Sequence, residues 1–238
     1  MKIKIISDLH GLDSWKRAVD GADIYLFQGD YLDSYSPNIS GEQEYNNLKD
    51  IIEFKKQNPE KVILLLGNHC IHYRWMGNIP PCTRFNPKLA YSFHSLFEEN
   101  KKLFQSAYQI GNHLFTHAGI SEMWFKKHEN TIKPFWDMLA EKDNGANLAD
   151  VINELVDTKY RNILFEVGKC RGGYGFGGPF WSDISETKDG IIPGFHQYCG
   201  HSRVEKIHSI KVNDNTSITY CDTLNTDGAK EEFLTIEI

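Results

Sequence analysis

Six side chains of the kinds that bind divalent metal ions follow short apolar segments of the sequence. They are Asp8, His10, Asp30, Asn68, His117 and His201. Carboxylate, amide and imidazole groups in one set suit a pair of divalent cations that share one carboxylate. Such a pair can activate water and clamp the oxygens of a displacement reaction. The residue types therefore predict a two-metal hydrolase.

The spacing of these residues defines several short motifs. The first three are Asp8-x-His10, Gly29-Asp30-x-x-Asp33 and Gly67-Asn68-His69. Each motif alone has a simpler interpretation, because Asp, Asn and Gly are also common in turns and helix caps. A lone histidine at a strand end is likewise more often structural than a ligand. Suitable donors at several separate strand ends, in this order, favour a common metal site.

The apolar segments that precede these residues are typical of short β-strands. We expect strands at Ile3–Ile6, Ile24–Phe27, Val62–Leu66, Leu114–Phe115 and Phe195–Cys199. In an open α/β sheet, the ligand crevice lies beyond the carboxyl ends of the strands. The six donors would therefore meet at the strand ends, although they span most of the sequence.

Helical segments alternate with these strands in the first part of the chain. Residues 12–19 and the segment carrying Tyr45, Leu48 and Ile52 show helical spacing. Asn86-Pro87 resembles the start of a further helix. The alternation favours a layered α/β architecture over separate helical and sheet domains.

The second part of the chain is predicted to contain a hairpin, a helical region and a group of late strands. Residues 105–110 and 113–116 are expected to pair through a Gly111-Asn112 turn. Residues 120–165 are predicted to be mostly helical, with Asn147 and Asp150 forming a cap. Later strands are expected at Ile207–Val212, Ser217–Tyr220 and Glu232–Ile236, with a turn at Asn225–Gly228. Because no linker is visible, we expect one domain over 1–238, with an insert around 120–190 that shapes the substrate cleft.

Composition excludes some classes of function. The chain has 238 residues, of which 40% are hydrophobic, and these can form a sizeable core. A net charge of −6 provides no general attraction to nucleic acid or to acidic membranes. No apolar run is long enough to span a bilayer. The five cysteines form no C-x-x-C pair, which argues against a zinc knuckle or a disulfide framework and favours a reducing cytoplasm.

The combined motifs resemble those of the calcineurin-like metallophosphoesterases. The similarity is greatest to the branch that contains the phosphoprotein (Ser/Thr) phosphatases and the bacterial symmetrical dinucleoside-tetraphosphatases. Phe180-Trp181-Ser182-Asp183 and Gly200-His201 also resemble segments of that branch. The motifs extend from position 8 to about 203, so the resemblance covers most of the chain. It implies an α-β-β-α sandwich of mixed sheets with helices outside and the metal site at the strand ends.

The resemblance also implies a role for each site residue. One ion would be held by Asp8, His10 and Asp30, and the other by Asp30, Asn68, His117 and His201. A hydroxide bridging the two ions would attack phosphorus in line. His69 would protonate the leaving oxygen and Asp33 would orient His69. The ions would be divalent, with Mn²⁺ expected first and Fe, Zn or Mg as alternatives.

Two positions depart from the family pattern. Ser34 replaces an arginine that usually grips phosphate, and Cys70 replaces a usual glutamate. Because the chain has only six arginines, few substitutes for the lost arginine exist. The substitutes we predict, in order of preference, are Arg171, Arg74 and Arg203, each of which could instead be an ordinary surface charge.

These expectations describe an enzyme that hydrolyses phosphomonoesters, with phosphoserine and phosphothreonine in proteins as candidate substrates. One alternative is a dinucleoside-polyphosphate hydrolase. Another is a catalytically silent binding module of the same fold, suggested by the losses at Ser34 and Cys70. The expected partner is a phosphorylated protein, small molecule or nucleotide. Neither a membrane nor a specific nucleic acid sequence is expected as a partner.

Overall fold

The computed structural model describes residues 1–224 and 232–238. The chain forms two compact units. The first comprises Met1–Gln105, Arg203–Ile207 and Cys221–Ile238, and the second comprises Ser106–Ser202 and His208–Tyr220. Each unit contains its own five-stranded sheet.

The sheet of the first unit has the strand order β10-β1-β2-β3-β4. Its strands are β1 (Lys2–Ile6), β2 (Ile24–Phe27), β3 (Val62–Leu65), β4 (Phe104–Gln105) and β10 (Leu234–Glu237). Strands β1 to β4 run parallel, and β10 is antiparallel to β1. All residues of β2 and β3 are buried. Burial of both faces explains why these strands are continuously apolar instead of alternating.

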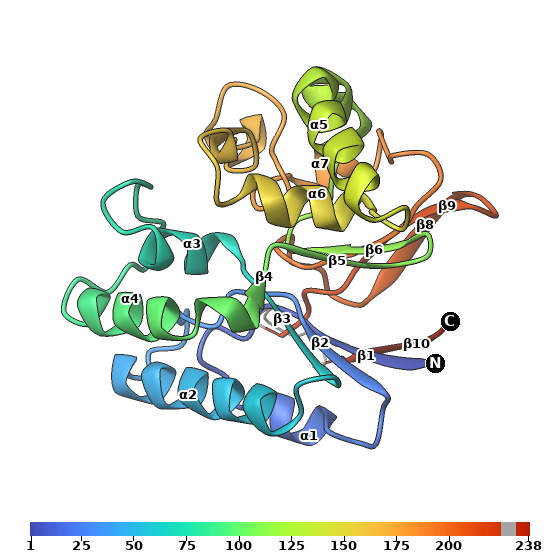
Figure 1. Ribbon diagram of the computed structural model, residues 1–238. Coiled ribbons are helices and arrows are strands. Elements are labelled where there is room, and N and C mark those ends of the chain that lie inside the picture. The colour runs from blue at the N-terminus through green and yellow to red at the C-terminus, as the bar shows by residue number, and fades with distance from the viewer. Residues whose placement is uncertain (225–231) are drawn as a thin grey trace. The chain divides into compact units, whose positions relative to one another are not determined.

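Helices connect the strands of the first unit. They are α1 (Trp15–Ala18), α2 (Gly41–Gln57), α3 (Asn68–Arg74), α4 (Ala90–Glu99) and the short 3₁₀ helix η1 (Lys101–Leu103). Helix α2 begins with a capping box between Ser40 and Gln43, which satisfies two backbone donors at its start. Figure 1 shows α2 running alongside α4, where the rings of Tyr45 and Phe93 lie 6.1 Å apart.

The sheet of the second unit has the order β5-β6-β7-β9-β8. Its strands are β5 (Ala107–Ile110), β6 (His113–Thr116), β7 (His196–Cys199), β8 (His208–Asn213) and β9 (Thr216–Tyr220). Its helices are α5 (Glu122–Lys142), α6 (Leu148–Leu155), α7 (Ile184–Thr187), η2 (Arg161–Ile163) and η3 (Lys169–Arg171). Figure 1 shows α5 and α6, in yellow-green and yellow, on the same side of β5 and β6. The predicted cap of Asn147 and Asp150 is confirmed as a capping box that starts α6.

Several predicted boundaries are wrong. Helix α1 covers only four residues of the predicted 12–19 segment. Asn86 does not start a helix, because its side chain accepts from the backbone N–H groups of Lys88 and Leu89 in a turn and α4 begins at Ala90. The predicted turn at Asn225–Gly228 lies outside the described residues.

The predicted single strand over residues 105–110 is also wrong, because it breaks at Ser106. Strand β4 belongs to the sheet of the first unit, whereas β5 belongs to that of the second. The Asn153 side chain of α6 accepts from the N–H groups of Ser106 and Ala107 and donates to the Ala107 carbonyl. A side chain distant in sequence therefore satisfies the backbone hydrogen-bonding groups at the point where β4 ends and β5 begins.

Two mixed sheets with helices confirm the predicted α/β class. A single domain with an insert around 120–190 stays a prediction. Among the described residues, no helix is long and apolar enough to cross a membrane. All five cysteines are free thiols.

Candidate metal and acid site

Three adjacent parallel strands of the first unit end next to predicted metal ligands. Asp8 follows β1, Asp30 follows β2, and Asn68 is the first residue of α3 after β3. All three side chains are buried. Because parallel strands place their carboxyl ends at one edge of the sheet, these residues come from neighbouring positions.

Two glycines permit the loops after β2 and β3 to come close together. A Cβ atom on Gly29 would lie 2.4 Å from the backbone nitrogen of Gly67. A Cβ atom on Gly67 would lie 2.2 Å from Oδ1 of Asp30. Gly29 also has a φ of 101°, which favours glycine over other residues. Gly29 therefore permits a backbone conformation and a close approach to Gly67 that a side chain would prevent.

His10 is oriented by a backbone carbonyl. Its Nδ1 atom lies 2.7 Å from the carbonyl oxygen of Leu32, which can only accept, so Nδ1 carries the proton. The other ring nitrogen, Nε2, lies 3.8 Å from Oδ2 of Asp30. Burial lowers the pKa of His10 despite the nearby Asp30 carboxylate. A neutral ring with its Nδ1–H fixed on a carbonyl is the form in which histidine binds metal through Nε2.

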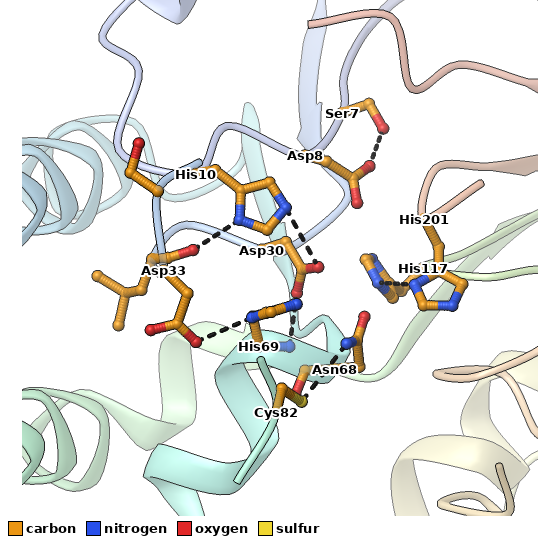
Figure 2. Close-up of polar contacts among 12 residues, drawn as sticks. Ser7, Asp8, His10, Asp30, Asp33, Asn68, His69, Cys82, His117 and His201 are labelled. Atoms are coloured by element: carbon orange, nitrogen blue, oxygen red, sulfur yellow. Dashed lines mark hydrogen bonds and ion pairs between the residues drawn. The ribbon is translucent and has the colours of Figure 1, made fainter. Parts of the chain in front are cut away.

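The carboxylate of Asp30 has different neighbours at its two oxygens. Oδ1 accepts a hydrogen bond of 2.8 Å from the backbone N–H of His69, whereas Oδ2 is the oxygen that faces His10. One ligand atom each from His10, Asp30 and His69 can be chosen so that all three lie within 4.8 Å of one another. Figure 2 shows these side chains together with Asp8, whose carboxylate accepts a hydrogen bond from Ser7.

Asn68 is held by Cys82, a residue that the sequence did not single out. The amide nitrogen of Asn68 donates to the sulfur of Cys82 at 3.5 Å, and the thiol lies 3.2 Å from the Asn68 backbone carbonyl. Since the amide nitrogen faces sulfur, the amide oxygen is directed elsewhere. The oxygen is the atom by which asparagine binds a divalent cation.

The predicted contact between Asp33 and His69 is present. Nδ1 of His69 donates to Oδ2 of Asp33 at 2.8 Å. Burial opposes the charge on His69, but Asp30 and Asp33 outweigh it and raise the pKa of His69. Burial also opposes the charge on Asp33, but hydrogen bonds from His69 and His72 leave its pKa lowered. The pair therefore favours an anionic carboxylate beside a protonated imidazole, which is suited to donate a proton.

Two further residues of α3 bind Asp33. Nε2 of His72 lies 3.2 Å from Oδ2, and the hydroxyl of Tyr73 donates to Oδ1 at 2.6 Å. The backbone N–H of Cys82 donates to Nδ1 of His72 at 3.2 Å, so Nε2 carries the ring proton. His72 and Tyr73 follow His69 by one helical turn, and that spacing is a signal the sequence contained.

The second unit contributes two predicted ligands. His117 follows β6 and His201 follows β7, and these strands are parallel neighbours. Nε2 of His117 lies 3.2 Å from Nδ1 of His201, as drawn in Figure 2. Two nitrogens about 2.0–2.1 Å from one tetrahedral ion would be separated by about 3.4 Å. The spacing of the pair therefore fits two ligands of one cation.

Five described residues other than glycine have a positive φ. They are His10, Asp30, Asp33, Arg84 and His201, with φ values from 44° to 66°. This conformation is uncommon for residues with a Cβ atom and concentrates at functional sites. Four of the five are predicted site residues.

The three arginines predicted to bind phosphate have different surroundings. Arg171 contacts Asp183 through Nε at 2.9 Å, and its guanidinium also donates to Ser202 at 3.0 Å. Arg74 is buried, with its guanidinium carbon 4.4 Å from the centre of the Trp75 ring. Arg203 is exposed. Of the three, Arg171 is partly neutralised by a carboxylate, and Arg203 presents its charge to solvent.

The donor set of the first unit fits divalent cations. Two carboxylates, one amide and one imidazole are the ligands expected for Mn²⁺, Fe, Zn²⁺ or Mg²⁺. The histidine pair of the second unit offers nitrogen donors, which Mg²⁺ uses less readily. The residues therefore fit a transition metal better than magnesium.

Comparison with known proteins supports a phosphoesterase fold. The family model "Metallophos: Calcineurin-like phosphoesterase" matches residues 1–196. A cold-active protein-tyrosine phosphatase of the psychrophile Shewanella sp. is 18% identical, with a TM-score of 0.57 over 99% of this chain and 75% of that chain. A protein serine/threonine phosphatase from Saccharomyces cerevisiae is 16% identical, with a TM-score of 0.52 over 100% of this chain and 80% of that chain. No curated protein matches the sequence.

Proposed function

Since the chain belongs to the calcineurin-like phosphoesterase family, we propose that it is a metal-dependent enzyme that hydrolyses phosphomonoesters. Phosphoserine and phosphothreonine in proteins are candidate substrates, together with small phosphate esters. The observation that carries the proposal is the 2.8 Å hydrogen bond between Asp33 and His69. It provides an oriented proton donor in the unit that also contains the carboxylates of Asp8 and Asp30.

The proposed enzyme uses two divalent ions. Asp8, His10 and Asp30 would hold one ion, and Asp30, Asn68, His117 and His201 would hold the other. The family resemblance motivates this division, and the hydrogen bonds of His10 and Asn68 support their roles as ligands. When bound, a pair of such ions activates water and neutralises the charge of the phosphoryl oxygens.

The residues of the chain would supply the remaining steps. His69 gives a proton to the leaving oxygen, which otherwise departs as a poorly stabilised alkoxide. Asp33 keeps His69 oriented through Nδ1 and stabilises the charged ring until the proton is transferred. A hydrogen bond from Tyr73 and the close contact of His72 hold Asp33 in the position that this requires.

We put Mn²⁺ first as the metal, because the donor set mixes carboxylate oxygen with imidazole nitrogen. A reducing cytoplasm is the compartment that five free thiols favour. Of the three arginines predicted to bind phosphate, we place Arg203 first because Arg171 already contacts Asp183.

An assay of the metal-loaded protein tests the proposal. The protein is stripped with a chelator, reloaded with Mn²⁺ and assayed on an aryl phosphate, a phosphoserine peptide and a dinucleoside tetraphosphate. We expect the monoesters to be hydrolysed and elemental analysis to give two metal ions per chain. The chelated protein should be inactive.

Other outcomes would contradict the proposal in separate ways. Turnover of the dinucleoside tetraphosphate alone would replace the monoesterase with a polyphosphate hydrolase. Bound metal without turnover of any substrate would favour a silent binding module.

A further inference from the structure

Tyr35 of the first unit has two arginines and two site histidines around its ring. The guanidinium carbon of Arg203 lies 3.9 Å from the ring centre, and that of Arg84 lies 5.5 Å away. The ring of His10 packs edge-on against Tyr35 at 4.9 Å, and that of His69 lies 6.3 Å away. The Tyr35 side chain therefore contacts two arginines and also lies next to the predicted metal ligand His10 and the predicted acid His69.

The backbone of Arg84 is strained in the same way as that of the site residues. Its φ is 66°, and the other described non-glycine residues with positive φ are all predicted site residues. Such conformations are unfavourable for residues with a Cβ atom and are retained where the surrounding structure enforces them. The conformation of Arg84 is therefore an independent sign that its position matters.

The residues before and after Arg84 in the sequence are hydrogen-bonded to side chains of α3. Two residues earlier, the backbone N–H of Cys82 donates to His72 at 3.2 Å. Two residues later, the backbone N–H of Asn86 donates to the hydroxyl of Tyr73 at 2.8 Å. His72 and Tyr73 both bind Asp33. The same hydrogen bonds therefore hold Arg84 in place relative to Asp33.

Both guanidinium groups keep their charge available. Arg84 and Arg203 are exposed, and no carboxylate among the described residues forms an ion pair with either. A guanidinium that lies over an aromatic face keeps its N–H groups in its own plane, where they can bind two oxygens of a phosphate. Two such groups on one ring are suited to a ligand with more than one negative charge.

We propose that Arg84 and Arg203, held by Tyr35, form an anion subsite for the dianionic phosphoryl group of a phosphomonoester. The subsite takes over the role of the arginine that the family usually has at the position of Ser34. This inference rests on the proposed function, and it specifies the substrate class as monoesters over diesters, because a diester carries one negative charge fewer at its phosphorus.

The test compares arginine variants of the metal-loaded protein. Arg84→Ala, Arg203→Ala and Arg203→Lys are examined beside Arg17→Ala, which removes an exposed arginine of α1. Tyr35→Leu removes the aromatic support and keeps both charges. Calorimetry measures binding of inorganic phosphate, and steady-state kinetics measures KM and kcat on an aryl phosphate monoester and on its diester.

Each alanine variant of the subsite should weaken phosphate binding about 10-fold or more, which is the effect of one hydrogen bond to a charged group. KM for the monoester should rise similarly, and the diester should be affected less. Arg203→Lys should fall between Arg203→Ala and the unchanged protein, because lysine keeps the charge and loses the planar pair of donors. Tyr35→Leu should also weaken phosphate binding, and Arg17→Ala should change nothing.

Phosphate binding that is unchanged in Arg84→Ala and Arg203→Ala, with metal content and thermal unfolding also unchanged, would overturn the subsite. Loss confined to one of them would reduce the subsite to that arginine and overturn the pair. Absence of turnover in the unchanged protein would contradict the proposed function instead, and the phosphate titration would still decide the subsite.

Discussion

The two units present their predicted ligands in different ways. In the first unit, Asp30 and His10 are held by hydrogen bonds to backbone groups, and Asp33 and His69 form a charged pair beside them. In the second unit, His117 and His201 contact each other. Both sets follow adjacent parallel strands, so the same sheet geometry supports two kinds of site. The first unit can carry metal binding and proton transfer, whereas the second offers ligands alone.

The supporting contacts differ as well. Asp33 accepts hydrogen bonds from His69 and Tyr73 and lies 3.2 Å from Nε2 of His72. The segment around Arg84 donates in turn to His72 and Tyr73. In the second unit, Arg171 contacts the backbone carbonyl of His201 and is itself paired with Asp183. The contacts in the first unit surround a charged pair, whereas the contact in the second unit is made to the backbone of a predicted ligand.

The largest effect is expected for Asp30→Asn, because this carboxylate is predicted to serve both ions. Turnover of the aryl phosphate should fall to background, and the metal content should drop. Asp50→Asn, which changes an exposed aspartate of α2, is the control. Activity of Asp30→Asn close to that of the unchanged protein would show that Asp30 is not a shared ligand.

His69→Gln should lower kcat on an alkyl phosphate by about 10²–10⁴-fold, the usual contribution of a positioned acid. The loss should be much smaller on an aryl phosphate with an acidic phenol, since that leaving group needs no proton. Metal content should stay constant. Loss of metal in this variant would instead make His69 a ligand, which its proximity to His10 and Asp30 also permits.

In the second unit, His117→Gln and His201→Gln should each lower the affinity for one ion by at least about 10–100-fold. The double variant should lose little more than either single variant, because the pair is proposed to act on one ion. Metal titration followed by elemental analysis measures the effect. His196→Gln, which alters another histidine of the same sheet, should bind metal normally.

The buried carboxyl group of Glu44 in the first unit should make the free energy of unfolding depend on pH. Burial raises the pKa of Glu44 to about 7, and it also raises the pKa of the half-exposed Glu186. A raised carboxyl pKa stabilises the fold at low pH, and this stabilisation is lost as the pH rises from the unfolded value through about 7. In chelated protein, Glu44→Gln should therefore increase the free energy of unfolding above pH 7 by at most about 3 kcal/mol.

Denaturant unfolding at pH 5 and pH 8 measures that effect. Glutamine keeps an oxygen that can accept from the Ser34 backbone N–H, so the contact itself is preserved. Glu186→Gln is the matched variant, because Glu186 also accepts from a loop N–H, that of Gly177. If Glu44→Gln increased the free energy of unfolding equally at both pH values, the effect would not come from the charge of the Glu44 carboxylate.

The smallest effect is expected for Tyr73→Phe, which removes the hydrogen bond from the Tyr73 hydroxyl to Asp33. We expect kcat to fall about 10-fold, since a hydrogen bond to a charged group contributes about 1.5–3 kcal/mol. Metal content should not change, and any rise in KM should be smaller than the fall in kcat, although the hydroxyl also accepts from Asn86 next to Arg84. A change in KM alone would place the effect of Tyr73 in substrate binding through the Arg84 segment. Tyr91→Phe, which changes an exposed tyrosine of α4, is the control.

Local sequence patterns predicted much of the framework of this protein. Apolar runs of the correct length identified β1, β2 and β3, because strands buried on both faces are continuously apolar. The same runs predicted that the polar residues Asp8, Asp30 and Asn68 follow strands, and these residues do follow β1, β2 and β3. The contact of Asp33 with His69 followed from the family resemblance, and the structure confirms it. These features depend on spacing within one segment or on a recognisable motif.

Contacts between distant segments could not be predicted in this way. The break at Ser106 depends on Asn153 of α6, and the orientation of Asn68 depends on Cys82. Arg203 was one of three candidate arginines, and only the structure put it against Tyr35. Arg84 was not a candidate, because an arginine in an irregular segment carries no periodic signal.

The sequence by itself determined which side chains the strands deliver to the edge of each sheet. The tertiary structure alone decided which partners orient them. The physical reason is that strand and helix periodicity is set by neighbouring residues, whereas the left-handed conformations of Asp30, Asp33 and Arg84 are stable only when distant groups hold them.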